Sequence, residues 1–208
     1  HNSESHRNDA GEDKANSARA YIDGSINGTE SNTVEVNIVE PHLVIDKNII
    51  TAANDAGDPM VYRISMTNDA DTEFGANDAA PAFELALSDS LDSNLNLQSI
   101  TIYTAGEHGS LSGLTSCGGT AQTVTDTSTT GVGGTASVDI SCLNPGETLV
   151  VDVNTVVIDT APAGVTIPNA ATITGTSLPG GDSGNYDSDG NSTGSDVPGN
   201  PGDDMGER

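Results

Sequence analysis

The sequence predicts an all-β protein: an Ig-like antiparallel β-sandwich with extended N-terminal strands and a Gly/Asp-rich C-terminal tail. The first observation is a series of short stretches in which apolar and polar residues alternate and β-branched residues are frequent. The second is the turn signals between them, such as Asn144-Pro145-Gly146-Glu147. The third is that no stretch shows a helical period. With 3% aromatic residues and 24 glycines in 208 residues, the composition favours short strands with many turns, or a partly unstructured chain.

The N-terminal region, residues 1–39, is expected to form an extension with two strands. Residues 1–17 are polar and show no period. Residues 17–26 and 32–39 have the composition of strands, and the segment Asn27-Gly28-Thr29 between them is a turn signal.

A second unit, residues 40–178, begins at the Glu40-Pro41 pair, where proline interrupts the strand pattern. After Leu178 the chain becomes rich in Gly, Asp, Ser and Asn and the strand patterns stop, so we expect residues 179–208 to form a loop or linker. The strands expected in the second unit are residues 43–49, 60–67, 83–91, 99–103, 121–126, 136–141, 148–158 and 165–174.

Three of these strands carry one polar residue in an otherwise apolar stripe. The polar residues are Lys47, Asp89 and Asn169. Their in-phase neighbours are Leu43 and Ile45 for Lys47, then Phe83, Leu85, Leu87 and Leu91 for Asp89, and Val165, Ile167, Ala171 and Ile173 for Asn169. Residues in phase on a strand point to the same face, and a lone buried lysine costs several kcal/mol. We therefore expect the three polar side chains to meet in the core.

The net charge of the chain disfavours two classes of binding partner. The net charge is −25, from 31 acidic against 6 basic residues, which disfavours binding to nucleic acids or anionic membranes and suits exposure to salt or divalent cations. No apolar run approaches the length of a transmembrane helix. The sequence starts at His1 in polar residues without the pattern of a signal peptide, so we expect a mature product or a piece of a longer protein. Between residues 41 and 178 the only bases are Lys47 and Arg63, against 16 acids, which argues against Lys47 being an incidental surface charge.

The two cysteines, Cys117 and Cys142, lie in strand-and-turn sequence with no CxxC pair and no histidine at zinc-ligand spacing. In a secreted protein they would form a disulfide, worth about 3–4 kcal/mol for a loop of this size. The alternative is a pair of buried thiols.

Several short motifs, in a fixed order, resemble a known family. They are Asp46-Lys47, residues 56–68, Ala80-Pro81-Ala82-Phe83, residues 87–91, Asn144-Pro145-Gly146-Glu147 and Pro168-Asn169-Ala170-Ala171. In this order and spacing they resemble the DUF11-type, Ig-like repeats of large bacterial surface adhesins, which are related to the isopeptide-forming domains of fimbrial (pilin) proteins. The resemblance covers residues 40 to about 178.

The resemblance implies roles for the three polar residues. In the isopeptide-forming relatives, a lysine on the first strand bonds to an asparagine on the last with the help of an acid, and the matching positions are Lys47, Asn169 and Asp89. Burial lowers the pKa of lysine and raises that of aspartic acid, so the neutral amine can attack while a protonated Asp89 polarises the Asn169 carbonyl. The alternative is a hydrogen-bonded Lys-Asp-Asn cluster without covalent chemistry.

Calcium is the cofactor that the sequence predicts. Alternating oxygen-bearing residues around a glycine, at Asp187 to Asn191, resemble the start of a calcium loop. The expected ligands in the tail are Asp182, Asn185, Asp187, Asp189, Asn191 and Asp196. A second candidate is the loop from Asn68 to Asp78, with Asp69, Asp71, Glu73 and Asp78. The alternative for the tail is a solvated flexible linker.

Three classes of function follow. The first is a structural subunit or repeat of an extracellular filament or adhesin on the bacterial cell surface, with other copies of itself as partners and an adhesive target that the sequence does not identify. The second is a carbohydrate- or ligand-binding β-sandwich module, for which two Phe, four Tyr and no Trp offer little aromatic surface. The third is an enzyme, for which no catalytic constellation is present, so we expect none.

The junction at Val39-Glu40-Pro41 predicts how copies of the chain assemble. In the repeats that this chain resembles, such a junction follows the last strands of the preceding unit. Residues 18–39 would then complete a neighbouring copy by β-strand addition, and repetition head to tail gives a fibre. The alternative is that residues 18–39 fold back on their own domain.

Overall fold

The computed structural model describes residues 13–17, 19–20, 29–37, 39, 41–70, 79–119 and 121–176. Every strand pair in this part of the chain is antiparallel, and the described residues contain no helix. Hence no helix there is long and apolar enough to cross a bilayer. The predicted all-β fold is confirmed.

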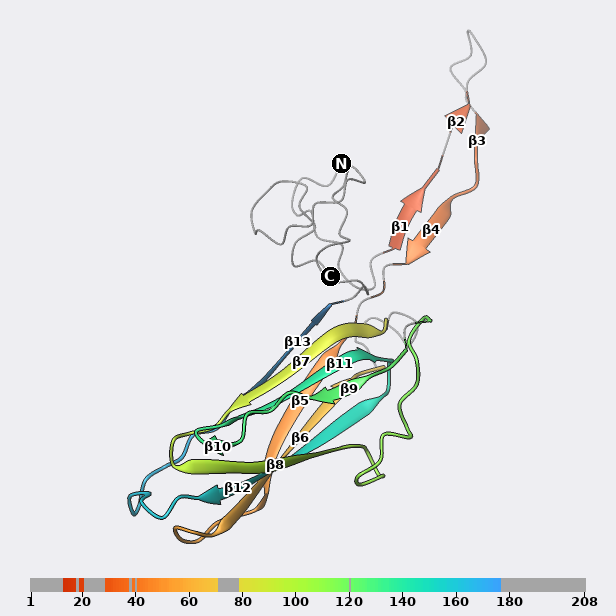
Figure 1. The fold of residues 1–208 in the computed structure, drawn as a ribbon. Coiled ribbons are helices and arrows are strands. Elements are labelled where there is room, and N and C mark those ends of the chain that lie inside the picture. The colour runs from red at the N-terminus through yellow and green to blue at the C-terminus, as the bar shows by residue number, and fades with distance from the viewer. Residues whose placement is uncertain are drawn as a thin grey trace.

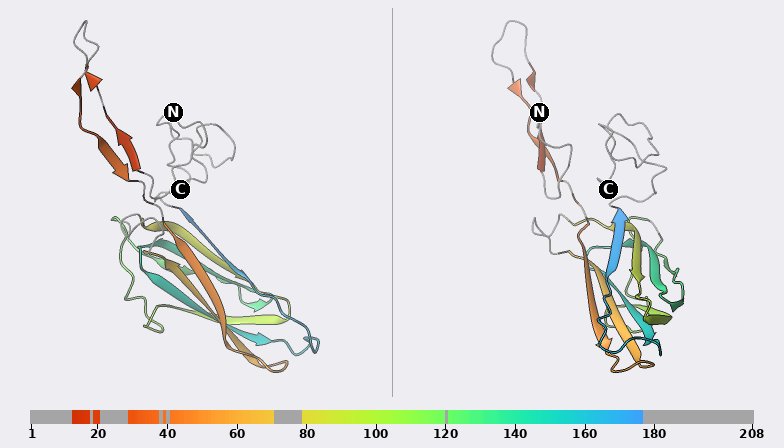
Figure 2. Two further views of the ribbon diagram at one scale, coloured as in Figure 1. Left: turned by 180° about the vertical axis from the view of Figure 1, so that it is seen from behind. Right: turned by 90° about the vertical axis from the view of Figure 1, so that its left-hand side faces the viewer.

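Two sheets pack face to face as a β-sandwich (Figures 1 and 2). The five-stranded sheet has the order β10-β8-β12-β6-β5 and the four-stranded sheet the order β13-β7-β11-β9. The first sheet comprises β5 (Leu43–Thr51), β6 (Pro59–Asn68), β8 (Leu95–Thr104), β10 (Gly131–Val132) and β12 (Thr148–Val157). The second comprises β7 (Ala82–Ser90), β9 (Val124–Asp126), β11 (Thr135–Leu143) and β13 (Ala171–Thr176).

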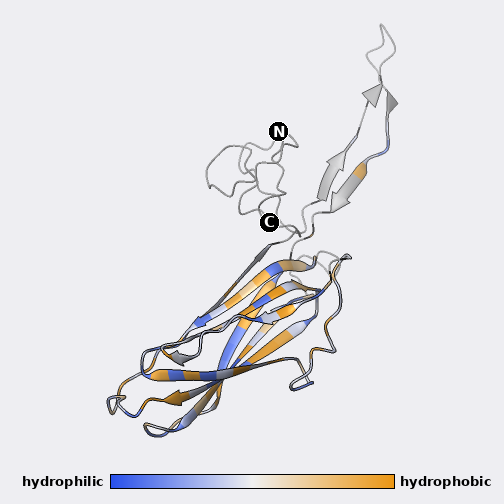
Figure 3. Cartoon of the chain, in the orientation of Figure 1, coloured by the Kyte–Doolittle hydropathy of each residue, from blue (hydrophilic) through white to orange (hydrophobic). Residues whose placement is uncertain are grey.

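The core lies between the two sheets, and hydrophobic and hydrophilic residues alternate along the strands that enclose it (Figure 3). Ile64 and Val151 from the first sheet and Leu87 and Val138 from the second are fully buried. Burying such a side chain contributes about 1.5–3 kcal/mol, so this layer supplies most of the hydrophobic stabilisation. The alternation that predicted the strands is therefore the pattern that builds the core.

Four short strands near the N-terminus form two small sheets of their own. They are β1 (Asp13–Asn16), β2 (Arg19–Ala20), β3 (Thr29–Glu30) and β4 (Val34–Asn37). Strand β1 pairs with β4 and β2 with β3, and none of the four joins either sheet of the sandwich (Figure 1). The sequence predicted two strands in this region, at residues 17–26 and 32–39, and did not predict β1. Its polar sequence carries no period, and its pairing with β4 is a non-local contact that local composition does not reveal.

The last strand begins later than predicted. Residues 165–170 belong to no strand, and β13 starts only at Ala171. Proline cannot donate a backbone hydrogen bond, and Pro168 lies inside this segment. The predicted facing is nevertheless correct for Ile167, Asn169 and Ala171, which are half-buried while the residues between them are exposed. It is wrong for Val165, which is 45% exposed.

Strands β5 and β13 lie at neighbouring edges of the two sheets. A Cβ at Gly175 of β13 would lie 2.5 Å from Leu85 Cδ2 and 3.4 Å from Leu43 Cδ1. The missing side chain thus lets β13 approach β7 and the start of β5 together. The first and last strands of the sandwich are brought close enough for their side chains to share one site.

Candidate functional site

Lys47 lies on β5 and points between the sheets, in phase with Leu43 and Ile45. Its Nζ donates a hydrogen bond to Asp89 Oδ2 on β7 at 2.6 Å. The Asp89 side chain is fully buried and that of Lys47 is 14% exposed. This ion pair therefore crosses the core from one sheet to the other.

Asn169 completes the cluster from the segment that leads into β13. Its Nδ2 donates to the same oxygen, Asp89 Oδ2, at 3.5 Å. The structure thus brings together the three residues that the sequence placed in apolar stripes. One detail differs from the expectation: Asp89 contacts the amide nitrogen of Asn169, whereas the sequence-based mechanism had it contact the carbonyl oxygen.

Tyr62 on β6 is a fourth member of the cluster that the sequence analysis missed. Lys47 Nζ lies 4.8 Å from the centroid of its ring, within cation–π range. The Tyr62 residue is 4% exposed, and it is in phase with the fully buried Ile64 and Met66. That phase was the signal in the sequence, because it places a polar hydroxyl on the inner face of β6.

Burial shifts the ionisation of the pair toward neutrality. Burial lowers the pKa of Lys47, and the hydrogen bond and charge of Asp89 oppose that shift. Burial likewise raises the pKa of Asp89, and Lys47 and Asn169 oppose that shift. Because burial prevails in both residues, the structure favours a neutral amine next to a neutral carboxylic acid more than water does.

The cluster also holds three unpaired polar atoms. Among the described residues, the buried side-chain oxygens and nitrogens without a hydrogen-bond partner are Tyr62 Oη, Asp89 Oδ1 and Asn169 Oδ1. A buried polar atom without a partner costs about 1–3 kcal/mol, so such atoms are rare and call for an explanation. Their concentration in one cluster marks it as the candidate functional site.

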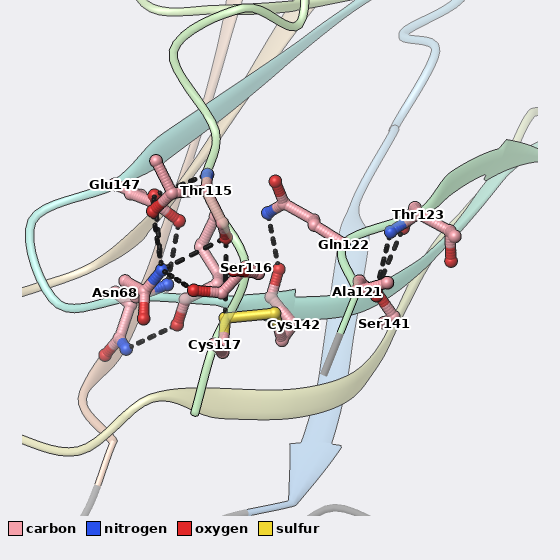
Figure 4. Close-up of a disulfide and its surroundings, with 12 residues drawn as sticks. Asn68, Thr115, Ser116, Cys117, Ala121, Gln122, Thr123, Ser141, Cys142 and Glu147 are labelled. Atoms are coloured by element: carbon pink, nitrogen blue, oxygen red, sulfur yellow. Dashed lines mark hydrogen bonds between the residues drawn. A yellow bond between two sulfur atoms is a disulfide. The ribbon is translucent and has the colours of Figure 1, made fainter. Parts of the chain in front are cut away.

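A second stabilising feature is the disulfide between Cys117 and Cys142, predicted from the sequence and present in the structure (Figure 4). It ties the long excursion between β8 and β9 to β11, and the two cysteines pack against Phe83. Glu147 holds the same excursion, because its Oε1 accepts hydrogen bonds from Thr115 N at 2.9 Å and Thr115 Oγ1 at 2.7 Å.

The predicted calcium ligands lie mostly outside the described residues. These are Asp71, Glu73 and Asp78 in the loop, and Asp182, Asn185, Asp187, Asp189, Asn191 and Asp196 in the tail. Asp69 is described, and its carboxylate lies 4.0 Å from His42 Nδ1. Within the described ranges, no group of three or more His, Cys, Asp or Glu residues could hold a metal ion. The calcium sites stay predictions.

Asn68, at the start of the predicted calcium loop, has a structural role instead. Its fully buried Nδ2 donates to Ala80 O at 2.8 Å and to Leu143 O at 2.9 Å. Its Oδ1 accepts from His42 N at 3.1 Å. Asn68 therefore joins three segments of the sandwich, and its side-chain oxygen is already engaged.

The outer face of the five-stranded sheet carries a second ion pair. Arg63 Nε and Nη2 donate to the two oxygens of Asp152 at 2.8 and 2.9 Å. Tyr103 Oη donates to Asp152 Oδ2 at 3.0 Å, and His108 stacks against the Tyr103 ring. Thus Lys47 and Arg63, the two bases between residues 41 and 178, each have an aspartate as partner.

A groove of about 400 Å³ lies at the end of the sandwich, between residues 53–60 and 157–167. Its lining consists mainly of alanines and other small side chains, with no aromatic residue among those that form it. This groove therefore does not supply the aromatic platform that the carbohydrate-binding alternative would need.

Comparison with known proteins gave structural matches only: no family model and no curated protein matches the chain. The Bacillus cereus major pilin subunit BcpA (D312A variant) has 15% identity and a TM-score of 0.47, over 79% of this chain and 43% of that chain. The N-terminal domain of the Streptococcus gordonii adhesin Sgo0707 has 16% identity and a TM-score of 0.38, over 67% and 30%. The T6 backbone pilin of serotype M6 Streptococcus pyogenes has 15% identity and a TM-score of 0.36, over 67% and 29%. The chain spans less than half the length of each, and the resemblance to DUF11-type repeats stays a prediction.

Proposed function

We propose that this chain is a structural module of a bacterial extracellular filament or adhesin, and that a Lys47–Asn169 isopeptide bond closes its sandwich. The observation that carries the proposal is the buried contact of both nitrogens, Lys47 Nζ and Asn169 Nδ2, with the single oxygen Asp89 Oδ2. A nucleophile, its target amide and an acid–base group therefore meet at the buried carboxyl of Asp89.

The reaction balances without any further reactant. A proton passes from the Lys47 ammonium to Asp89, and the neutral amine attacks Asn169 Cγ. Asp89 Oδ2 then takes a proton from Nζ and gives one to Nδ2, the Cγ–Nδ2 bond breaks, and ammonia leaves. The products are a secondary amide between the two side chains, ammonia and a protonated Asp89. No electrons are gained or lost.

Such a bond suits a module that carries load. It would link the first strand of the sandwich, β5, to the segment that leads into the last strand, β13. A pulling force that enters at β5 and leaves at β13 would pass through the amide, and the strands between residues 47 and 169 would be shielded from it.

The remaining features suit the same setting. Disulfides persist in oxidising, extracellular environments, and Cys117–Cys142 is one. The net charge of −25 keeps the surface soluble and disfavours nucleic acid as a partner. We therefore place the module outside the cell, with its adhesive target unidentified.

Head-to-tail assembly is part of the proposal. Strands β1 to β4 join neither sheet of the sandwich, which leaves them free to serve another copy. Edge strand β5 exposes Val44, Ile49 and Ile50, at 42, 53 and 46%. An exposed apolar edge favours β-strand addition, and repeating such a contact without closure gives a fibre.

Intact mass under reducing conditions tests the bond. The parent chain should weigh less than its sequence mass by one ammonia, whereas Lys47→Ala should show its full sequence mass and a lower melting temperature. Arg63→Ala removes the other base of the sandwich and serves as the matched control, which should still lose one ammonia. A parent chain of full mass would leave only the non-covalent Lys-Asp-Asn cluster.

A further inference from the structure

We infer that the Tyr62 hydroxyl is the hydrogen-bond donor that stabilises the oxyanion formed at Asn169 Oδ1 during bond formation. The inference deepens the proposed function and rests on it. It assigns a role to a residue that the sequence did not single out, and to an atom that is otherwise buried without a partner.

Acyl transfer needs a donor at the carbonyl oxygen. When Lys47 Nζ attacks Asn169 Cγ, negative charge develops on the buried Oδ1, where a fixed donor stabilises it best. Asn169 Oδ1 is buried and has no hydrogen-bond partner in the unreacted arrangement. A donor must therefore come from a neighbouring side chain.

Asp89 is engaged elsewhere. Its Oδ2 contacts Lys47 Nζ at 2.6 Å and Asn169 Nδ2 at 3.5 Å. This position, between the attacking and the leaving nitrogen, is the one a proton shuttle needs. The second oxygen, Asp89 Oδ1, is buried without a partner, but the one proton that Asp89 carries is used between the two nitrogens. The carbonyl therefore needs a second donor.

Tyr62 is placed to be that group. Its ring lies beneath Lys47 Nζ, at 4.8 Å, and its hydroxyl, like Asn169 Oδ1, is buried without a hydrogen-bond partner. Burial raises the pKa of the phenol, and the side chain of Asn169, which faces the hydroxyl, partly offsets that rise. The phenol therefore keeps its proton and remains a donor near neutral pH.

The backbone around Tyr62 is rigid. Its strand β6 pairs with β5 on one side, where Tyr62 lies opposite Ile49, and with β12 on the other, opposite Val153. Two ladders fix the backbone of this donor, which limits the rearrangement needed when charge develops at Asn169 Oδ1. After the reaction the hydroxyl can keep donating to the new amide oxygen.

Tyr62→Phe in the full chain tests the inference. The chain is made by cell-free synthesis, quenched in acid at intervals, reduced and weighed intact, so the loss of ammonia is followed with time. Removing one oxyanion donor slows acyl transfer by about 10²–10³-fold, and we expect a slowing of that order. Tyr103→Phe is the matched control: it also removes a buried hydroxyl, one that donates to Asp152, and should leave the rate unchanged.

A second substitution separates chemistry from packing. With 3-fluorotyrosine at position 62, the side chain keeps its shape but its hydroxyl becomes a stronger donor, so ammonia loss should be faster than in the parent. Equal rates for the parent, Tyr62→Phe and the fluorinated chain would overturn the inference while the isopeptide bond stands. A parent chain that never loses ammonia would instead overturn the proposed function itself.

As a stability control, Tyr62→Phe is also made in the unreactive Lys47→Ala background. In this unreactive background Tyr62→Phe should melt at the same temperature or higher, because the hydroxyl that it removes is buried without a hydrogen-bond partner before reaction. If the hydroxyl only supported the fold, Tyr62→Phe would lower that melting temperature, and the fluorinated chain would react at the parent's rate.

Discussion

At the scale of single residues, Lys47 and Arg63 lie in opposite environments, which shift their pKa values in opposite directions. Lys47 lies in the core, where burial lowers its pKa. Around it, one polar atom each on Tyr62, Asp89 and Asn169 has no hydrogen-bond partner. Arg63 lies on the outer face, where both oxygens of Asp152 accept its hydrogen bonds and raise its pKa. The first arrangement favours reaction and the second favours a persistent ion pair.

The ion pair between Arg63 and Asp152 should make the free energy of unfolding depend on pH. Burial alone would raise the pKa of Asp152, but the hydrogen bonds from Arg63 and Tyr103 outweigh it and hold the pKa below its ordinary value of 3.8. A depressed carboxyl pKa stabilises the fold above the unfolded value, and this stability is lost as the pH falls through the folded pKa. Asp152→Asn should therefore lower the free energy of unfolding at pH 7 by about 1–2 kcal/mol, and this difference should shrink below about pH 4.

Urea unfolding between pH 3 and 7 measures this difference, with Lys47→Ala as the common background so that no covalent bond obscures the transition. Asp139→Asn, an exposed acid on β11, is the control and should leave the curve unchanged. A difference that stays constant down to pH 3 would contradict the prediction.

At the scale of elements, irregular segments are held by side chains. Asn68 joins the start of β5, the segment before β7 and the end of β11 through hydrogen bonds of 2.8 to 3.1 Å. The turn between β11 and β12 depends on Gly146, whose φ of +83° lies in the left-handed region that favours glycine. The excursion between β8 and β9 depends on the disulfide.

The disulfide is predicted to stabilise the excursion and, through it, the sandwich. Labelling of free thiols in the denatured, unreduced protein should give no signal. Replacing both Cys117 and Cys142 with serine should lower the free energy of unfolding by about 3–4 kcal/mol, because the loop they close spans 25 residues. Two labelled thiols in the unreduced chain, or an unchanged melting temperature in the double variant, would contradict this prediction.

At the scale of the whole molecule, the sandwich is complete as a core but open at an edge. Its two sheets bury a continuous apolar layer. The edge strand β5 exposes apolar side chains, while β1 to β4 pair only among themselves. These two facts underlie the prediction that copies join by β-strand addition.

Deleting residues 1–39 tests assembly. The shortened chain should be poorly soluble and able to accept a strand, and a peptide of residues 18–39 added in trans should restore solubility, because it would cover the edge. The control is a peptide of the same composition in scrambled order. A shortened chain that is monomeric, soluble and as stable as the parent would rule out the fibre.

Calcium binding is predicted for the tail and for the loop that begins at Asp69. Adding calcium at 100 times its dissociation constant should stabilise the chain by about 2.7 kcal/mol. A chelator should then lower the melting temperature and expose the tail to protease, and Asp187→Asn with Asp189→Asn should remove this response. Asp126→Asn, an exposed acid on β9, is the control. If the chelator leaves both the melting temperature and the protease sensitivity of the tail unchanged, the calcium prediction is wrong.

The amino-acid sequence by itself determined the strands of the sandwich except the two-residue β10, and the inward facing of Lys47, Asp89 and Asn169. Alternation and turn chemistry are local properties, and a polar residue in phase with apolar neighbours is visible without a structure. It also indicated the cysteine pair. It did not predict β1 or the late start of β13, because these depend on non-local pairing and on Pro168.

Only the tertiary structure decided which atoms meet. Register between β5 and β6 placed Lys47 over Tyr62, and the packing of the sheets turned Asp89 Oδ2 toward both nitrogens, not toward the carbonyl oxygen. Contacts of this kind join residues that are 42 and 80 positions apart in the chain. No local pattern encodes the relative position of two facing sheets, because packing across a core is a property of all its side chains together.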